Sequence, residues 1–236
     1  MVSREKSASC QPYKKTQVKI VMRAYRHYSI FDQMCLGLDQ ALRAVFDNPR
    51  TTGRAYPGAC EAEPVMTGEQ RQYSAALMRI NHSGEVCAQA LYHGQGMVSR
   101  SGVVKEKMDQ AAIEEGDHLA WCMLRINELG SHASYLNLLW YLGSLSIGFA
   151  AGLVGDRWSL GFLAETENQV VRHLEKHLML LPRQDKRSYK ILQQMQLDEA
   201  LHRDDAMKAG ASVLPGPVKK LMSLVSKVMV KVAYWV

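Results

Sequence analysis

Two short Glu-x-x-His motifs are the residues of this sequence whose types and spacing could do chemistry. They are Glu115-Gly-Asp-His118 and Glu199-Ala-Leu-His202. Residues three apart on a helix share one face, so each motif would present a carboxylate and an imidazole together. A single motif of this kind is weak evidence, because helices often carry glutamate and histidine on solvated faces.

A further glutamate precedes each motif at nearly the same distance. Glu85 lies thirty residues before Glu115, and Glu167 lies thirty-two residues before Glu199. In an antiparallel bundle this interval corresponds to one helix and a turn, which would bring each single glutamate level with the motif that follows it. The doubled pattern therefore indicates one site built from four helices.

The sequence around Glu167 predicts that this carboxylate faces inward. Glu165 lies two residues away, about 200° round a helix, and falls off the same face. Glu167 is therefore the candidate ligand. The apolar residues at helical spacing around it are Leu160, Leu163, Ala164, Val170, Val171, Leu174, Leu178 and Leu181.

Four buried carboxylates require balancing charge, because an unpaired buried charge costs several kcal/mol. Two divalent cations would supply that charge, and the two imidazoles would complete the ligand set. Oxygen-rich ligation with one nitrogen per metal suits iron or manganese better than zinc, and the same arrangement occurs in di-iron carboxylate bundles. The alternative is a set of solvated glutamates paired with Lys and Arg. The predicted metal ligands are Glu85, Glu115, His118, Glu167, Glu199 and His202.

The elements that must position these residues are long helices, and almost no segment alternates as a strand would. We expect an all-α, ferritin-like four-helix bundle with additional amphipathic or hydrophobic helices for membrane contact. Residues 1–26 would form a poorly ordered basic arm, and residues 27–236 a single domain. Turn formers in 47–64 predict a loop. The expected helices are 31–46, 67–96, 104–129, 158–181, 186–209 and 218–236.

Two apolar segments lie outside the predicted four-helix core. Residues 130–155 carry no charge, which leaves three alternatives: a transmembrane span, a buried connecting helix, or the preferred one, a helix in or on the membrane surface. The segment 218–236 interleaves lysines with Val, Leu and Met. It suits an anchor on anionic lipid, or equally a helix that caps the bundle.

Composition excludes several classes of protein. The chain is 47% hydrophobic and 22% charged, which is typical of a globular protein and not of a disordered chain or a multi-span transporter. Its basic residues are scattered, and no aromatic and basic platform is present, so we expect no nucleic-acid partner.

The segments around the predicted ligands resemble the ferritin-like di-iron demethoxyubiquinone hydroxylases of ubiquinone biosynthesis. These segments are LMRINHSGEVCAQALYHGQ, EEGDHLAW, AETENQVVRHLEKHL and LDEALHRDDA. All six ligand positions match the pattern of that family. The resemblance extends from about residue 26 to the C-terminus.

The resemblance implies a monooxygenase that uses two iron ions, O2 and an external reductant whose identity the sequence does not give. Its substrate would be a polyprenylated methoxy-methyl-benzoquinol, hydroxylated in the penultimate step of ubiquinone biosynthesis. We expect a peripheral protein on the cytoplasmic side of the cell membrane, with other proteins of ubiquinone biosynthesis as candidate partners.

Two other functions are compatible with parts of the sequence. A ferritin-like protein that oxidises or stores iron would need no organic substrate and would assemble as a soluble cage. A metal-free membrane scaffold would carry the same carboxylates as surface groups. The apolar segments argue against the cage, and the matched spacing argues against the scaffold.

Several further residues are candidates for supporting roles. Glu114 and Asp198 each precede a motif glutamate, and either could accept a hydrogen bond from the imidazole of the opposite motif. His173 and Tyr92 could face the substrate or the electron donor, or could be ordinary packing residues. His82 is expected to be structural, and Cys87 and Cys122 are expected in the core.

Overall fold

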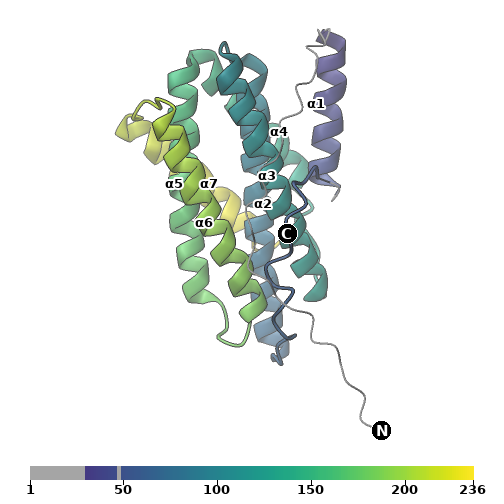
Figure 1. Cartoon of the computed structure of the whole chain (residues 1–236). Helices are drawn as coiled ribbons and strands as arrows, with labels where there is room; N and C mark the ends of the chain where they lie inside the picture. Colours follow the sequence, from purple (N-terminus) through teal and green to yellow (C-terminus); the bar gives the residue numbers. More distant parts are fainter. Residues whose placement is uncertain (1–29, 47–48) are drawn as a thin grey trace.

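The computed structural model describes residues 30–46 and 49–236, and every regular element within these ranges is an α-helix (Figure 1). The predicted arm, residues 1–26, lies outside the described residues, and the single domain at 27–236 remains a prediction. The all-α class is confirmed. The helices are α1 (Ile30–Val45), α2 (Gly68–Val98), α3 (Gly102–Glu128), α4 (Asn137–Val154), α5 (Asp156–Leu180), α6 (Lys186–Lys208) and α7 (Gly216–Ala233).

Local signals in the sequence account for the ends of the long helices. Thr67 caps α2, because its hydroxyl accepts from the Gln70 backbone N–H while the Gln70 side chain accepts from the Thr67 N–H. After α3 and α6, Gly130 and Gly210 adopt φ values of 71° and 95°, which favour glycine. Helix α5 ends just before Pro182, as predicted.

Helices α2, α3, α5 and α6 form the four-helix bundle that was predicted. Short connections join α2 to α3 and α5 to α6, and each pair packs side by side (Figure 1). Buried apolar side chains from all four helices fill the interior above and below the level of the predicted ligands. The bundle therefore has the layout that a site with one ligand segment per helix requires.

Helix α4 connects the α2–α3 pair to the α5–α6 pair and packs along α2. Two glycines allow a close approach, since a Cβ at Gly94 would lie 2.3 Å from the Leu145 carbonyl oxygen and one at Gly148 would lie 2.2 Å from that of Leu91. The two helices run parallel, because residues later in α2 meet residues later in α4. This long crossover is a feature of ferritin-like bundles.

The outer face of α4 bears on the alternatives for the charge-free segment. Only 28% of α4 is buried, which argues against the alternative of a buried connecting helix. Within the described residues, α4 is long and apolar enough to cross a membrane, although it packs along α2. The exposed apolar side chains on α4 are Leu138, Leu139, Leu142, Ile147, Phe149, Leu153 and Val154.

Candidate metal centre

The bundle brings all six predicted ligands together at one level. One glutamate comes from each of α2 and α5, and one Glu-x-x-His motif comes from each of α3 and α6. Their ligand atoms form two overlapping groups in which all atoms lie within 4.8 Å of one another. The first group is Glu85, Glu115, His118 and Glu199, and the second is Glu115, Glu167, Glu199 and His202.

Glu115 and Glu199 belong to both groups because each turns one oxygen toward each imidazole. His118 Nδ1 lies 3.0 Å from Glu115 Oε2 and 2.9 Å from Glu199 Oε1. His202 Nδ1 lies 3.6 Å from Glu115 Oε1 and 3.2 Å from Glu199 Oε2. Two carboxylates thus stand between two histidines, an arrangement suited to bridging a pair of metal ions.

The outer nitrogen of each imidazole contacts an acid from the opposite motif. His118 Nε2 lies 3.0 Å from Asp198 on α6, and His202 Nε2 lies 2.6 Å from Glu114 on α3. These contacts confirm both supporting contacts that the sequence suggested. Such a partner fixes the ring orientation and keeps Nδ1 directed at the metal position.

Arg54, in the loop before α2, is a member of the site that sequence reasoning missed. Its guanidinium donates to Asp117 at 2.8 Å and to Asp198 at 2.7 Å, and it lies 4.7 Å from the centre of the Trp121 ring. It therefore holds the acid that orients His118. No periodic pattern could have found it, because the loop has neither helical nor strand spacing.

The same loop is fitted closely onto α3. Thr52 donates to Asp117 through its backbone N–H at 2.9 Å and also through its hydroxyl. A Cβ at Gly116 would lie 1.8 Å from the Arg50 carbonyl oxygen, so only glycine allows this contact. The glycine inside the first motif, which had no assigned role in the sequence, is what lets the Arg54 loop reach the site.

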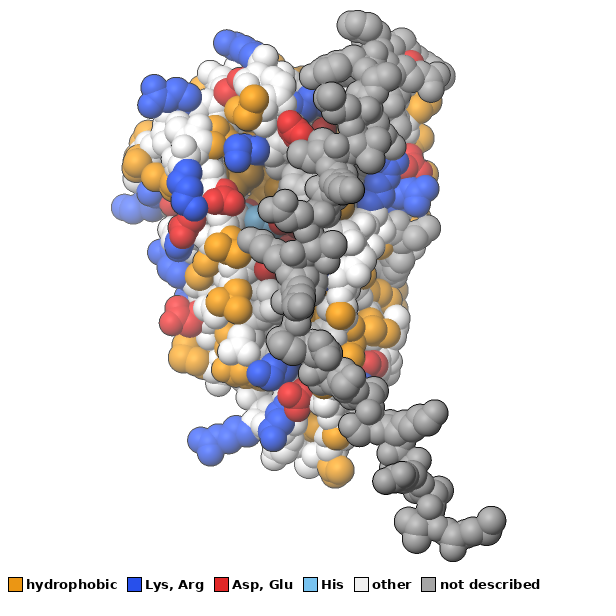
Figure 2. All heavy atoms as spheres, in the orientation of Figure 1, with side chains coloured by type: hydrophobic (Ala, Val, Ile, Leu, Met, Phe, Trp, Pro, Cys, Tyr) orange, Lys and Arg blue, Asp and Glu red, His pale blue; other side chains and the backbone are white. Residues whose placement is uncertain are grey.

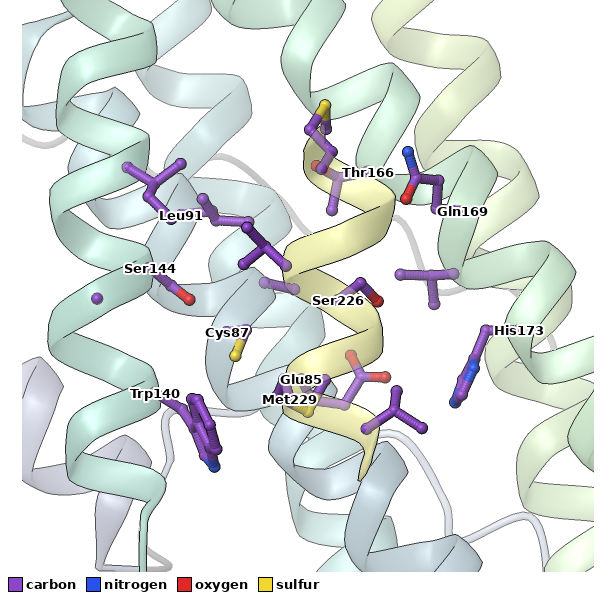
Figure 3. Close-up of a pocket in the computed structure, with 18 of the residues that line it drawn as sticks. Glu85, Cys87, Leu91, Trp140, Ser144, Thr166, Gln169, His173, Ser226 and Met229 are labelled. Atoms are coloured by element: carbon purple, nitrogen blue, oxygen red, sulfur yellow. The ribbon is translucent and has the colours of Figure 1, made fainter. Parts of the chain in front are cut away.

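A cavity of about 510 Å³ lies between α2, α4, α5 and α7 and reaches the metal centre at Glu85. Apolar side chains form most of its wall. In Figure 3 the Glu85 side chain, which lines the cavity, lies between Trp140 on one side and His173 on the other. The cavity therefore offers an apolar volume of small-molecule size beside one predicted metal ligand.

Comparison with known proteins decides which family this arrangement represents. A family model described as "Ubiquinone biosynthesis protein COQ7" matches residues 72–233, which include all six predicted ligands. The chain belongs to this family. Arg54 lies outside the matched residues.

Three relatives of this COQ7-family chain carry the name 3-demethoxyubiquinol 3-hydroxylase. The protein of Nitrosococcus oceani is 50% identical over 211 residues, covering 89% of this chain and 99% of the relative. That of Nitrosomonas eutropha is 51% identical over 205 residues, covering 87% and 98%. That of Acinetobacter baumannii is 50% identical over 210 residues, covering 89% and 99%.

Unpaired oxygens in the COQ7-family site show that the residues present suit metal ions. Both oxygens of Glu167 and Oε1 of Glu115 are buried and accept no hydrogen bond from the described residues. Buried carboxylate oxygens without partners are costly unless a cation binds them. Two divalent ions would balance the four carboxylates and use the two inward Nδ1 atoms.

Without metal ions, the four carboxylates differ in how readily they ionise, because each is surrounded by other glutamates and the histidines. Burial, together with repulsion from nearby glutamates, raises the pKa of Glu85 and Glu167 well above the usual range. Burial would also raise the pKa of Glu115 and Glu199, but the adjacent histidines lower both. The shared glutamates are therefore the ionised ones.

The remaining candidate residues have different positions. His173 and Cys87 both line the cavity, where Cys87 is partly buried and packs against a core cluster. Cys122 is fully buried in the core as predicted. Tyr92 is packed among apolar residues of the bundle. His82 contacts Asn137 near the start of α4. Glu165 is buried but pairs with Lys219 at 3.2 Å, away from the predicted ligands.

Proposed function

We propose that this chain is a di-iron, O2-dependent monooxygenase that hydroxylates a polyprenylated methoxy-methyl-benzoquinol, demethoxyubiquinol, in the penultimate step of ubiquinone biosynthesis. The observation that carries the proposal is the pair of ligand groups that share Glu115 and Glu199 and adjoin an apolar cavity at Glu85. The names of the relatives supply the reaction and the substrate class. Membership of a ubiquinone biosynthesis family favours this function over iron storage.

When bound, two ferrous ions would supply the electrons and the binding positions that activate O2, and an external reductant would restore them. The chain provides the ligands and their orientation. Asp198 and Glu114 hold His118 and His202 with Nδ1 directed inward. Arg54 neutralises Asp198 and so keeps that acid in its ionised, accepting form.

The cavity positions the substrate and excludes water. Its apolar walls suit a benzoquinol ring and the first units of a prenyl tail, and Glu85 places the predicted metal centre at one wall. Excluding water protects a reactive oxidant from side reactions. Helices α4 and α7 both line the cavity and both expose leucines on their outer faces.

We place those two outer faces against the cytoplasmic side of the cell membrane as a peripheral contact. The exposed leucines Leu142 on α4 and Leu224 on α7, which do not line the cavity, would enter the acyl region, while Lys220 and Lys227 would meet anionic headgroups. A prenyl tail residing in lipid could then reach the cavity between α4 and α7. By contrast, the face seen in Figure 2, over α5 and α6, mixes charged and apolar side chains.

The reaction is tested with protein purified without oxygen and loaded with Fe(II). We expect about two irons per chain, as in di-iron carboxylate bundles. On addition of the quinol and 18O2, we expect a product heavier by one labelled oxygen. Glu115→Gln, which alters a ligand of both groups, should abolish hydroxylation and reduce iron binding more than Glu85→Gln, which alters one group. Asp205→Asn, at an exposed acid on α6, is the matched control and should leave both measurements unchanged.

Three outcomes would contradict the proposal: unlabelled product, wild-type protein that binds well under two irons, or hydroxylation that survives Glu115→Gln. Uptake of iron far beyond two ions per chain into a large assembly would instead support iron storage. If neither iron content nor stability changes in any of the ligand variants, the result would support a metal-free scaffold.

A further inference from the structure

Two polar atoms in the wall of the cavity lack a hydrogen-bond partner. Among the cavity-lining residues, Asn81 Nδ2 and Trp140 Nε1 are buried and contact no acceptor in the described part of the chain. Both are N–H donors, and an unpaired buried donor is costly. A ligand that satisfies them must bring acceptor oxygens.

Asn81 is the better placed of the two donors. It is 3% exposed and lies on α2 four residues before Glu85, so both side chains lie on one face of the helix a single turn apart. A ring oxygen bound at Asn81 would therefore keep the ring next to the ligand that joins the cavity to the metal centre.

His177 on α5 determines which end of the Asn81 amide is free. His177 Nδ1 lies 2.9 Å from Asn81 Oδ1, and an amide oxygen can only accept, so Nδ1 carries the hydrogen. Burial, followed by the nearby His173, lowers the pKa of His177 to about 3, so the ring is neutral at physiological pH. With Oδ1 occupied, the amide nitrogen is left for a ligand in the cavity.

We propose that Asn81, oriented by His177, is the residue that binds an oxygen of the benzoquinol ring by donating a hydrogen bond from Nδ2. This inference rests on the proposed function and extends it from a substrate class to a contact. Asn81 is the binding residue, and His177 is a positioning residue that acts through it. The contact selects a ring that carries acceptor oxygens over a hydrocarbon of the same shape.

The experiment measures binding to the iron-loaded protein without turnover. The probes are an oxidised methoxy-methyl-benzoquinone with one prenyl unit and a prenylated toluene that lacks every ring oxygen. Asn81→Leu removes the donor at nearly constant volume, and we expect it to weaken quinone binding by about 10-fold and hydrocarbon binding by less than about twofold. In turnover, KM should rise while kcat changes little.

His177 variants test the positioning role separately. His177→Phe removes the hydrogen bond that orients Asn81 and should weaken quinone binding, whereas His177→Asn places an N–H near the position of Nδ1 and should restore it. Asn127→Leu is the matched control, because it makes the Asn-to-Leu change at an exposed position of α3 that does not line the cavity. It should bind both probes as the wild type does.

The results separate the contact from the function. If Asn81→Leu weakens binding of both probes equally, or leaves quinone binding unchanged, the inference about Asn81 is wrong. Hydroxylation by the wild type would still support the proposed function. Quinone binding that depends on Asn81 in a protein that inserts no labelled oxygen would overturn the proposed function and leave the contact intact. If Asn81→Leu does not fold, the His177→Phe and His177→Asn pair decides, and equal quinone binding by those two variants would reject the contact.

Discussion

Each imidazole of the centre is held between inner glutamates and one outer acid supplied by the opposite motif. The acid beside His118 is Asp198, which also receives Arg54. The Arg54 side chain is only 19% exposed, and it binds Asp117 as well, so the loop, α3 and α6 meet at one guanidinium. A planar side chain with several donors can hold both acids at once, which a lysine could not.

Replacing Arg54 should weaken metal retention without removing a ligand. In Arg54→Met, Asp198 loses its cation and the orientation of His118 is less well fixed, so we expect iron affinity to fall by about 10- to 100-fold. Competition with a chelator measures this. Arg50→Met is the control, because among the described residues the ion pair of the Arg50 side chain is with the partly exposed Asp39, away from the predicted ligands. Equal affinities in the two variants would show that the Arg54 contacts do not support the site.

The protonation of the ligands also leads to a prediction at the residue scale. Burial alone would lower the pKa of both histidines, but the acids around them raise the pKa of His118 and His202 well above the ordinary value. The pKa values of Glu85 and Glu167 are raised as well. Without metal, the raised pKa values therefore favour the protonated form of all four groups.

Metal uptake should displace these protons, because metals bind neutral imidazole and ionised carboxylate. We expect binding of Fe(II) near pH 7 to release protons. Affinity should rise with pH, since protons compete with the metal below the raised pKa values. Calorimetry in buffers with different ionisation enthalpies counts the protons. Release of fewer than about one proton per pair of Fe(II) ions would contradict this account of the metal-free site.

At the scale of elements, contact between α2 and α4 depends on glycine. Gly148→Ala would force the two backbones apart, because the added Cβ would lie 2.2 Å from the Leu91 carbonyl oxygen. We expect the free energy of unfolding to fall by about 1–3 kcal/mol. Gly143→Ala in the same helix meets nothing within 4 Å, so it should be neutral or raise that free energy by up to about 1 kcal/mol.

Denaturant unfolding of the two glycine variants is the measurement. Because α4 also lines the cavity, Gly148→Ala should widen the gap between α2 and α4 and weaken quinone binding as well. Similar stability for Gly148→Ala and Gly143→Ala would mean that the helices can separate at little cost.

For the molecule as a whole, the proposed membrane face determines where the substrate comes from. Leu142→Glu combined with Leu224→Glu places charge on the exposed sides of α4 and α7, away from the cavity. We expect co-sedimentation with anionic phospholipid vesicles to fall by at least about 10-fold, because each leucine loses apolar burial in lipid and a carboxylate is repelled by the headgroups. Iron content should not change.

Two leucines on α6 provide the matched control for the membrane experiment. Leu197 and Leu201 are exposed to a similar extent but lie away from the cavity. Leu197→Glu combined with Leu201→Glu should leave vesicle binding intact. The assignment of the membrane face would be wrong if both double variants lost binding equally or if neither did.

The sequence by itself determined the helices, the six candidate ligands and the two acids beside the histidines. These depend on relations within a helical turn and on matched intervals between helices, which are fixed by the regular geometry of the helix. The three alternatives for residues 130–155 stayed open in the sequence, because hydropathy does not tell which face of α4 meets a neighbour.

Only the tertiary structure decided how the ligands are shared and what surrounds them. The double role of Glu115 and Glu199, the approach of Arg54 over Gly116, and the free amide of Asn81 all join residues from separate elements. Such contacts depend on how whole helices and an aperiodic loop pack in three dimensions. No periodic pattern along the chain encodes the distances between residues of separate elements.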